Sequence, residues 1–153
     1  MTTSTLSIRK MEAADLDQVV ELDRPNGGDK RRGFFEKRLS ASGKHANAFI
    51  SLVAETDGKV AGFVYAYMLD GEFGGQAPVA VLDAIGLAEE YRGHGAGMQL
   101  LEAMETEARA QKCVELRTQA NWGQQDLMGF FAEVGFEMAP RTVLTRSTEG
   151  VAF

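Results

Sequence analysis

The sequence is poor in the residues that bind metals or form disulfides. Its 153 residues include one cysteine, Cys113, and two histidines, His45 and His94. A single cysteine cannot form an internal disulfide, so nothing points to an oxidising compartment, and we expect a cytoplasmic protein. The three residues also lack the spacing of a zinc site, and we therefore predict that no metal is bound.

Long apolar runs and an excess of positive charge are also missing. No window reaches the roughly 18 apolar residues of a membrane-spanning helix, and residues 1–9 lack the apolar core of a signal peptide. The 16 Lys and Arg residues are outnumbered by 22 Asp and Glu, which gives a net charge of -6. This balance argues against nucleic acid and anionic membranes as partners and favours a cationic substrate.

The length and the apolar pattern predict one domain that spans residues 1–153. Apolar residues make up 44% of the chain, enough for a single buried core. Asp57-Gly58 is typical of a tight hairpin turn, and Asp29 is suited to cap a helix that Ser42-Gly43 ends. The order of elements predicts a mixed sheet covered by helices on both faces. Strands are expected at 6–10, 48–56, 59–69, 79–87, 114–118 and 136–146, and further helices at 12–23, 95–110 and 124–134.

Alternation along the two central strands assigns their side chains to faces. In 59–69, Phe63 is expected on one face with Tyr65 and Tyr67, while Val60 is expected on the other with Val64, Ala66 and Met68. In 79–87, Asp83 is expected on the same face as Ile85 and Leu87. An aspartate within such an apolar strand needs a polar or charged partner.

The run Tyr91-Arg92-Gly93-His94-Gly95-Ala96-Gly97 lies between an apolar strand and an amphipathic helix. Its three glycines lack the Cβ atoms that would keep an anion from the backbone N–H groups, and the helix directs its positive dipole end at the same point. A pyrophosphate is the ligand that such a turn favours, and Arg92 adds positive charge. Neither a Walker A pattern nor a Gly-x-Gly-x-x-Gly pattern is present, since Met98 occupies the last glycine position of the latter.

Two motifs resemble those of the Gcn5-related N-acetyltransferase superfamily, whose members transfer acetyl from acetyl-CoA to an amine. The segment from Leu87 to Gly97 is similar to the family's strand, short linker and Arg/Gln-x-x-Gly-x-Gly/Ala turn. The segment from Phe130 to Phe136 is similar to its later helix-end signature, an aromatic residue followed by Gly-Phe. The resemblance implies acetyl-CoA as cosubstrate and an α/β (α+β) fold, with a mixed, mostly antiparallel central sheet of six to seven strands and helices on both faces.

The resemblance also implies a coenzyme site. The pantetheine arm would pair like an extra strand with the backbone of Ile85, Gly86 and Leu87. Gln124 stands where the family often has an asparagine that contacts this arm, although Asn121 is a nearby substitute. Phe131 occupies the position of a common tyrosine, and we include it among the coenzyme contacts. The pyrophosphate would lie against the turn, at Arg92, Gly93, His94, Gly95, Ala96 and Gly97.

Resembling enzymes often carry an acidic residue on the strand before the turn as a general base that acts through water. Asp83 is therefore our candidate base, and the alternative is a structural aspartate paired with a cation or a backbone donor. The tyrosine that Phe131 replaces is commonly the general acid, and a phenyl ring cannot donate a proton. Tyr65, Tyr67 or water would then protonate the departing thiolate.

The sequence thus predicts an acetyl-CoA-dependent N-acetyltransferase that acts on a primary amine of a small molecule or a protein by direct attack in a ternary complex. A non-catalytic acetyl-CoA/CoA-binding sensor or regulatory module is the alternative, because the usual tyrosine is absent. The 17 residues after Phe136 are few for the hairpin that often closes this family's sheet. One strand is then either absent or supplied by a partner chain, and the second alternative predicts a homodimer.

Overall fold

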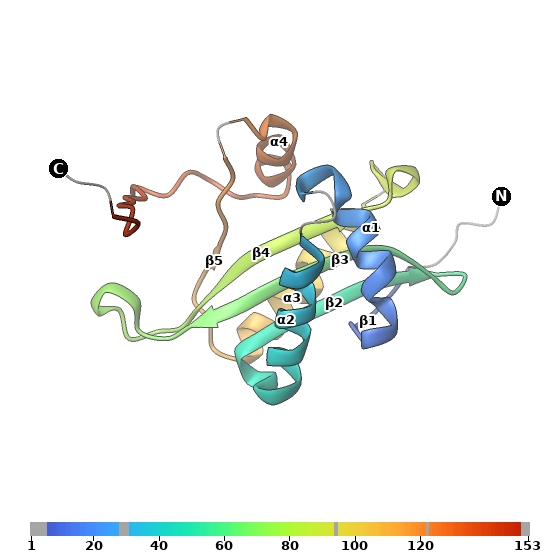
Figure 1. Cartoon of the computed structure of the whole chain (residues 1–153), viewed down its shortest axis with the longest axis horizontal. Helices are drawn as coiled ribbons and strands as arrows, with labels where there is room; N and C mark the ends of the chain where they lie inside the picture. The colour runs from blue at the N-terminus through green and yellow to red at the C-terminus, as the bar shows by residue number, and fades with distance from the viewer. Residues whose placement is uncertain (1–5, 28–30, 94, 122, 151–153) are drawn as a thin grey trace. The chain divides into compact units, whose positions relative to one another are not determined.

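The computed structural model describes residues 6–27, 31–93, 95–121 and 123–150 (Figure 1). It contains two compact units, residues 1–119 and residues 120–153. The first unit contains the sheet and the first three α-helices, and the second contains the fourth α-helix. That the whole chain acts as a single domain stays a prediction.

The first unit is built on a mixed sheet in which the strands follow one another in chain order, β1-β2-β3-β4-β5. Neighbouring strands pair antiparallel from β1 to β4, and only β4 and β5 pair parallel. The mostly antiparallel, mixed sheet predicted from the sequence is therefore confirmed. The strands are β1 (Ser7–Lys10), β2 (Phe49–Thr56), β3 (Lys59–Leu69), β4 (Val79–Leu87) and β5 (Leu116–Arg117).

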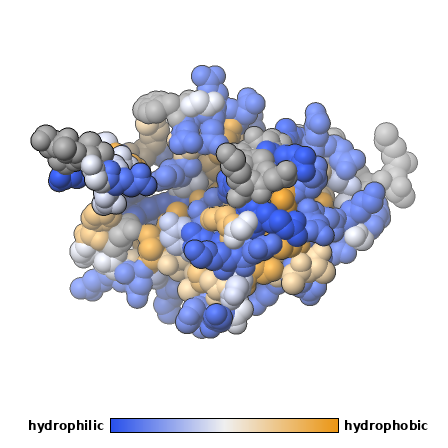
Figure 2. Space-filling model, viewed as in Figure 1, coloured by the Kyte–Doolittle hydropathy of each residue, from blue (hydrophilic) through white to orange (hydrophobic). Residues whose placement is uncertain are grey.

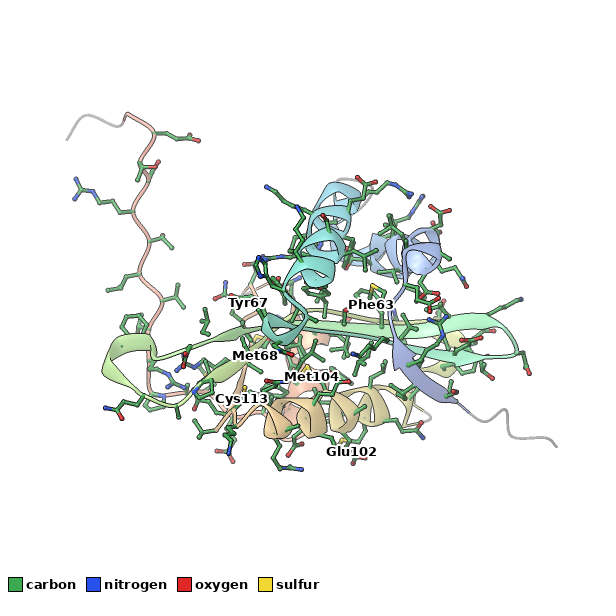
Figure 3. The ribbon with its side chains drawn as sticks, turned by 90° about the horizontal axis from the view of Figure 1, so that it is seen from below. Phe63, Tyr67, Met68, Glu102, Met104 and Cys113 are labelled. Atoms are coloured by element: carbon green, nitrogen blue, oxygen red, sulfur yellow. The ribbon has the colours of Figure 1, made fainter. Side chains whose placement is uncertain are left out.

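Helices cover both faces of this sheet, as the sequence predicts. In Figure 3 the sheet is seen edge-on, with α1 and α2 on one side and α3 on the other. The α-helices are α1 (Leu16–Gly27), α2 (Arg32–Lys44), α3 (Ala96–Ala110) and, in the second unit, α4 (Gln125–Glu133). Short 3-10 helices lie at η1 (Ala13–Asp15), η3 (Ala46–Ala48), η4 (Glu72–Gly74) and η5 (Glu89–Tyr91).

The core of the first unit has a layer on each side of the sheet. On one side, Val19 of α1 and Phe35 of α2 pack in a buried cluster with Phe63 and Tyr65 of β3. On the other side, α3 buries residues that recur at the helical period, because these fall on one side of the helix. Its buried residues are Ala96, Gly97, Leu100, Leu101, Met104 and Ala108. Figure 2 shows that polar and charged residues cover most of the outer surface on the side of α1 and α2.

Asp57 and Gly58 form the predicted hairpin turn between β2 and β3. Their φ angles are 50° and 75°, and both lie in the left-handed region. Two successive positive φ angles are typical of the two-residue turns whose twist matches that of paired strands. The turn therefore fixes where β2 ends and β3 begins.

Two register shifts interrupt the sheet and change which face some residues occupy. Between β2 and β3, Ala54 pairs with Gly62 and Glu55 with Val60, so one residue of β3 is extra. Val60 consequently joins the buried cluster of Phe63, and its predicted place on the opposite face is wrong. The second shift lies between β3 and β4, where Asp83 is the extra residue.

The predicted count of six to seven strands is wrong for the described residues, which form five. The segment 136–146 was expected to be a strand, but it joins no ladder there. Its apolar residues Met138, Val143 and Leu144 are exposed, at 83%, 70% and 88%, so they pack in no core among the described residues. The homodimer that would add a strand stays a prediction.

In the part of the chain that the structure describes, no helix combines the length and apolar character needed to cross a membrane. The cytoplasmic location and the absence of a bound metal stay predictions from the sequence.

Gly86 of β4 provides a test of the packing between β3 and β4. A Cβ atom at this position would lie 2.4 Å from Cε1 of Phe63, whose side chain is fully buried. Gly86→Ala should therefore lower the free energy of unfolding by about 1–3 kcal/mol, measured by urea denaturation. Gly33→Ala on α2 is the matched control, since a Cβ there meets nothing within 4 Å, and it should be neutral or stabilising. Equal stability of the two variants would contradict the packing described.

Candidate active site

The glycine turn between β4 and α3 adopts a backbone that requires glycine. Gly93 and Gly95 have φ angles of 80° and 81°, which side chains with a Cβ atom rarely adopt. A Cβ atom at either position would meet nothing within 4 Å, so the conformation and not a lack of room selects glycine. His94, which the sequence also assigns to this turn, lies outside the described residues.

The turn leads directly into the positive end of the α3 dipole. Gly95 is the N-cap and has no side chain to bond the first N–H groups, which lack partners within the helix. Ala96 and Gly97 follow it, and the first turn of α3 contains no acidic residue. An anion at this point would meet several N–H donors and an uncompensated positive dipole. The geometry fits the predicted pyrophosphate.

The backbone of β4 has an open edge beside this turn. Its parallel pairing with β5 is limited to Ala80 and Val81, and the hydroxyl of Thr118 donates to the carbonyl of Leu82 over 3.1 Å. No described strand pairs with that side of β4 from residue 83 to residue 87.

The residues that face the open edge follow from the pairing with β3. The N–H of Ala88 donates to the carbonyl of Ala61 over 2.8 Å, so alternation directs the backbone groups of Gly86 towards β3 as well. Those of Ile85 and Leu87 then face the open edge. An extended ligand with amide groups, such as pantetheine, could pair there like a strand.

The extra residue in β4 separates Asp83 from the face of Ile85 and Leu87, where it was predicted to lie. Leu87 faces α3, because a Cβ atom at Gly62 would lie 2.8 Å from its Cδ1 and 3.0 Å from Cδ1 of Leu100. Oδ2 of Asp83 instead lies 3.2 Å from Nη2 of Arg38, on α2 and across the sheet. The expected shared face of Asp83, Ile85 and Leu87 is therefore wrong, since a bulge interrupts the alternation.

Asp83 lies at the boundary between the sheet and α2. The side chain of Asp83 is 24% exposed. Because its Oδ2 is buried, the exposed area belongs to its other atoms. Oδ2 is within ion-pair distance of Arg38 but not in hydrogen-bond alignment. Burial raises the pKa of Asp83, and the positive charges of Arg38 and then Arg31 act in the opposite direction. A carboxyl group with a raised pKa is suited to act as a general base.

Two aromatic rings lie beside the cation that pairs with Asp83. The guanidinium carbon of Arg38 lies 5.2 Å from the ring centre of Phe34 and 5.3 Å from that of Tyr67. Figure 3 shows Tyr67 on the side of the sheet that carries α2. A second arginine, Arg31, lies 5.1 Å from the same Phe34 ring and pairs with buried Asp23 over 3.0 Å.

The sequence did not single out Arg38, which α2 brings to Asp83. The spacing of Phe34 and Arg38, four residues apart on one side of a helix, is the signal that could have shown their contact. Their approach to Asp83 could not be read from the sequence, because it joins α2 to β4.

Tyr65 joins α2 to the sheet and is not a free proton donor. Its buried hydroxyl donates to the backbone carbonyl of Arg38 over 3.2 Å and lies 3.1 Å from Oγ of Ser42. Because a phenol has one proton, Ser42 is the donor in the second bond. Burial raises the pKa of Tyr65. Both hydrogen bonds go to α2, which favours a structural role over the proton-donor role considered for this residue.

The second unit contains the two remaining predicted coenzyme residues. Oε1 of Gln124 accepts a hydrogen bond from the N–H of Asn121 over 2.9 Å, just before α4. The buried ring of Phe131 packs against Phe130 and Phe136, with centre distances of 5.6 and 5.2 Å. Both residues organise the ends and the packing of this unit, and their contact with a coenzyme stays a prediction.

Comparison with known families identifies the fold and the class of the protein. Residues 15–136 match the model of the acetyltransferase (GNAT) family, and the chain belongs to this family. Members of the family use acetyl-CoA as cosubstrate. The chain has no significant sequence match among curated proteins.

Solved structures with the same fold include proteins of different roles. Aminoglycoside N-acetyltransferase AAC(6')-Iy, in complex with CoA, is 22% identical, with 96% of this chain and 97% of that chain covered and a TM-score of 0.76. Ribosomal-protein-alanine N-acetyltransferase from Brucella melitensis is 19% identical, with 94% and 99% covered and a TM-score of 0.71. A transcriptional regulator from Bacillus halodurans is 16% identical, with 94% and 100% covered and a TM-score of 0.78. At these identities the likeness shows the fold alone.

The two hydrogen bonds of the Tyr65 hydroxyl should contribute to stability. Tyr65→Phe should lower the free energy of unfolding by about 1–2 kcal/mol, because Ser42 and the carbonyl of Arg38 lose a buried partner. Ser42→Ala removes only one of these bonds and should cost less. Urea denaturation measures both, and a Tyr65→Phe variant as stable as the wild type would contradict the link between α2 and β3.

Proposed function

We propose that the protein is an acetyl-CoA-dependent N-acetyltransferase that acetylates a primary amine of a small molecule or a protein. The observation that carries this proposal is the position of Asp83, a half-buried carboxylate at a bulge of β4, immediately before the open edge and the glycine turn. One strand thus provides both a candidate base and a binding edge for an acyl carrier. Family membership supplies the class of reaction.

The coenzyme would bind along β4 and at the start of α3. The N–H groups of the turn would hold the pyrophosphate, with Arg92 adding positive charge, and the backbone of Ile85 and Leu87 would pair with the pantetheine amides. Gly86 would not pair with the pantetheine itself, because its backbone groups face β3 and its missing Cβ makes room for the ring of Phe63. This arrangement would direct the thioester end of the coenzyme along the strand towards Asp83.

In the proposed reaction the acceptor amine attacks the thioester carbonyl carbon directly, in a ternary complex. A C–N bond forms as the C–S bond breaks, and Asp83 takes the proton of the amine nitrogen, directly or through water. The leaving thiolate takes a proton from solvent. Because a thiol has a pKa of about 8.5, the thiolate needs little assistance to leave. The reaction is therefore compatible with a phenylalanine at position 131 and with the structural role of Tyr65.

The acceptor is proposed to carry a primary amine and to be cationic overall, since the net charge of -6 favours a positive partner. The structural neighbours include enzymes named for an aminoglycoside and for a ribosomal protein, so both a small molecule and a protein are consistent with the fold. Nucleic acid and membranes are not proposed as partners.

A regulatory role without turnover is the second candidate. It is favoured by Phe131 in place of the usual tyrosine, and a transcriptional regulator shares the fold. Such a protein would bind acetyl-CoA and release no thiol when amines are added.

Thiol release from acetyl-CoA tests the enzyme against the regulatory module. A panel of aminoglycosides, polyamines, amino acid amides and peptides with a free N-terminus should include an acceptor that accelerates release well above the rate with acetyl-CoA alone. Mass spectrometry should find the acceptor heavier by one acetyl group. Tight coenzyme binding without amine-dependent release for any acceptor would favour the regulatory module.

Asp83→Asn tests the proposed base. The amide cannot accept the proton of the amine, so kcat should fall by about 100-fold or more near neutral pH. In the wild type the rate should fall as pH drops through the pKa of Asp83, which burial raises, because only the ionised carboxylate is a base. The variant should lose this dependence. Unchanged turnover of Asp83→Asn across the pH range would remove Asp83 from the mechanism.

A further inference from the structure

Arg38 contacts two aromatic rings in addition to Asp83. Its guanidinium lies over the rings of Phe34 and Tyr67, with centroid distances of 5.2 and 5.3 Å. A cation over two aromatic faces is attracted by both, and a planar guanidinium can also stack on such a ring. The Arg38 side chain is 35% exposed. The two rings and Asp83 therefore restrict an arginine that still contacts solvent.

The backbone of Arg38 is also fixed relative to the bulge. Its carbonyl accepts the hydrogen bond of Tyr65, and Tyr65 pairs across the sheet with Ala84, the neighbour of Asp83. The same tyrosine therefore anchors α2 and adjoins the strand that carries the candidate base. The hydrogen bond of Tyr65 and its pairing with Ala84 therefore hold Arg38 near Asp83 independently of the ion pair.

The groups that face Asp83 come from α2, its N-cap and β3. Arg38 lies on α2, and Arg31, the N-cap of α2, pairs with Asp23 of α1. Tyr65 and Tyr67 approach from β3 and carry no charge at neutral pH. Among the described residues, Arg38 is the cation in direct contact with Asp83, and the charge of Arg31 is balanced by Asp23, which is 1% exposed.

We propose that Arg38 is a positioning residue for the reaction, whose clamped guanidinium holds the Asp83 carboxylate in one orientation and keeps it charged. The inference rests on the proposed function, because an orientation matters only if Asp83 receives a proton. The ion pair engages the enclosed Oδ2 without an aligned hydrogen bond. The carboxylate is therefore stabilised as an anion while its exposed part stays available to a water molecule or an amine.

Direct titration of Asp83 tests the charge effect without any need for turnover. The carboxyl carbon of Asp83 is followed by NMR in protein labelled with 13C-aspartate, with its signal assigned from Asp83→Asn. Arg38→Gln should raise the pKa of Asp83 by about one unit or more, because a neighbouring positive charge is lost. Arg38→Lys keeps the charge and should shift it less. Arg32→Gln is the matched control, since this exposed arginine pairs with Asp17 and Glu36, and it should cause no shift.

The pH dependence of the acetylation rate tests the positioning role. In Arg38→Gln the acidic side of the kcat/KM profile should move to higher pH by the same amount as the titration of Asp83, and Arg38→Lys should restore part of the wild-type profile. A purely structural arginine would lower the rate at every pH and leave the midpoint unchanged. Should Arg38→Gln not fold, Arg38→Met, of similar length and without charge, should give the same shift.

The outcomes separate this inference from the proposed function. Wild-type turnover together with an unshifted Asp83 titration and an unshifted rate profile in the uncharged variants would overturn the role of Arg38 alone. Equal shifts in Arg38→Lys and Arg38→Gln would also overturn it, since charge would then have no effect. A wild-type protein that acetylates no amine would contradict the proposed function instead, whatever the titration of Asp83 shows.

Discussion

One extra residue in β4 is the constraint on which the rest of the site depends. Before the bulge, Ala80 and Leu82 direct backbone groups to β5; after it, Ile85 and Leu87 direct theirs to an open edge. The bulge residue itself, Asp83, faces α2. Val81, opposite Tyr67, already faces α2, so Asp83 continues the alternation of the residues before it, whereas Ile85 and Leu87 change sides at the shift. The shift thus leaves the carboxylate of Asp83 on the side of α2 and directs the backbone groups of Ile85 and Leu87 to the open edge, within one stretch of chain.

The position of Asp83 is costly, and the surrounding residues offset that cost. An ionised carboxylate that loses its water without a partner costs several kcal/mol, and a buried one therefore becomes protonated. Arg38 opposes that tendency, and the rings of Phe34 and Tyr67 hold it in place without adding charge. As a result, the Asp83 carboxylate has a higher pKa than an exposed aspartate, and its ion pair with Arg38 opposes full protonation.

Local patterns in the sequence predicted most helices, strands and turns. They could not predict the register in which neighbouring strands pair. β4 was predicted with its observed ends, and the Asp57-Gly58 turn and α3 were found because their signals lie within a few residues. Alternation failed at Val60 and Asp83, since it counts residues along one strand, whereas a bulge depends on the partner strand. The coenzyme turn was likewise local, but the partner of Asp83 lies 45 residues earlier in the chain.

A structure determined with coenzyme A bound is the most direct test of the account. It should show the pantetheine amides bonded to the backbone of Ile85 and Leu87, the pyrophosphate at the N–H groups of the turn before α3, and the carboxylate of Asp83 near the thiol end. Coenzyme A bound elsewhere, or bound to this edge with its thiol directed away from Asp83, would contradict the claim that the bulge of β4 organises the active site.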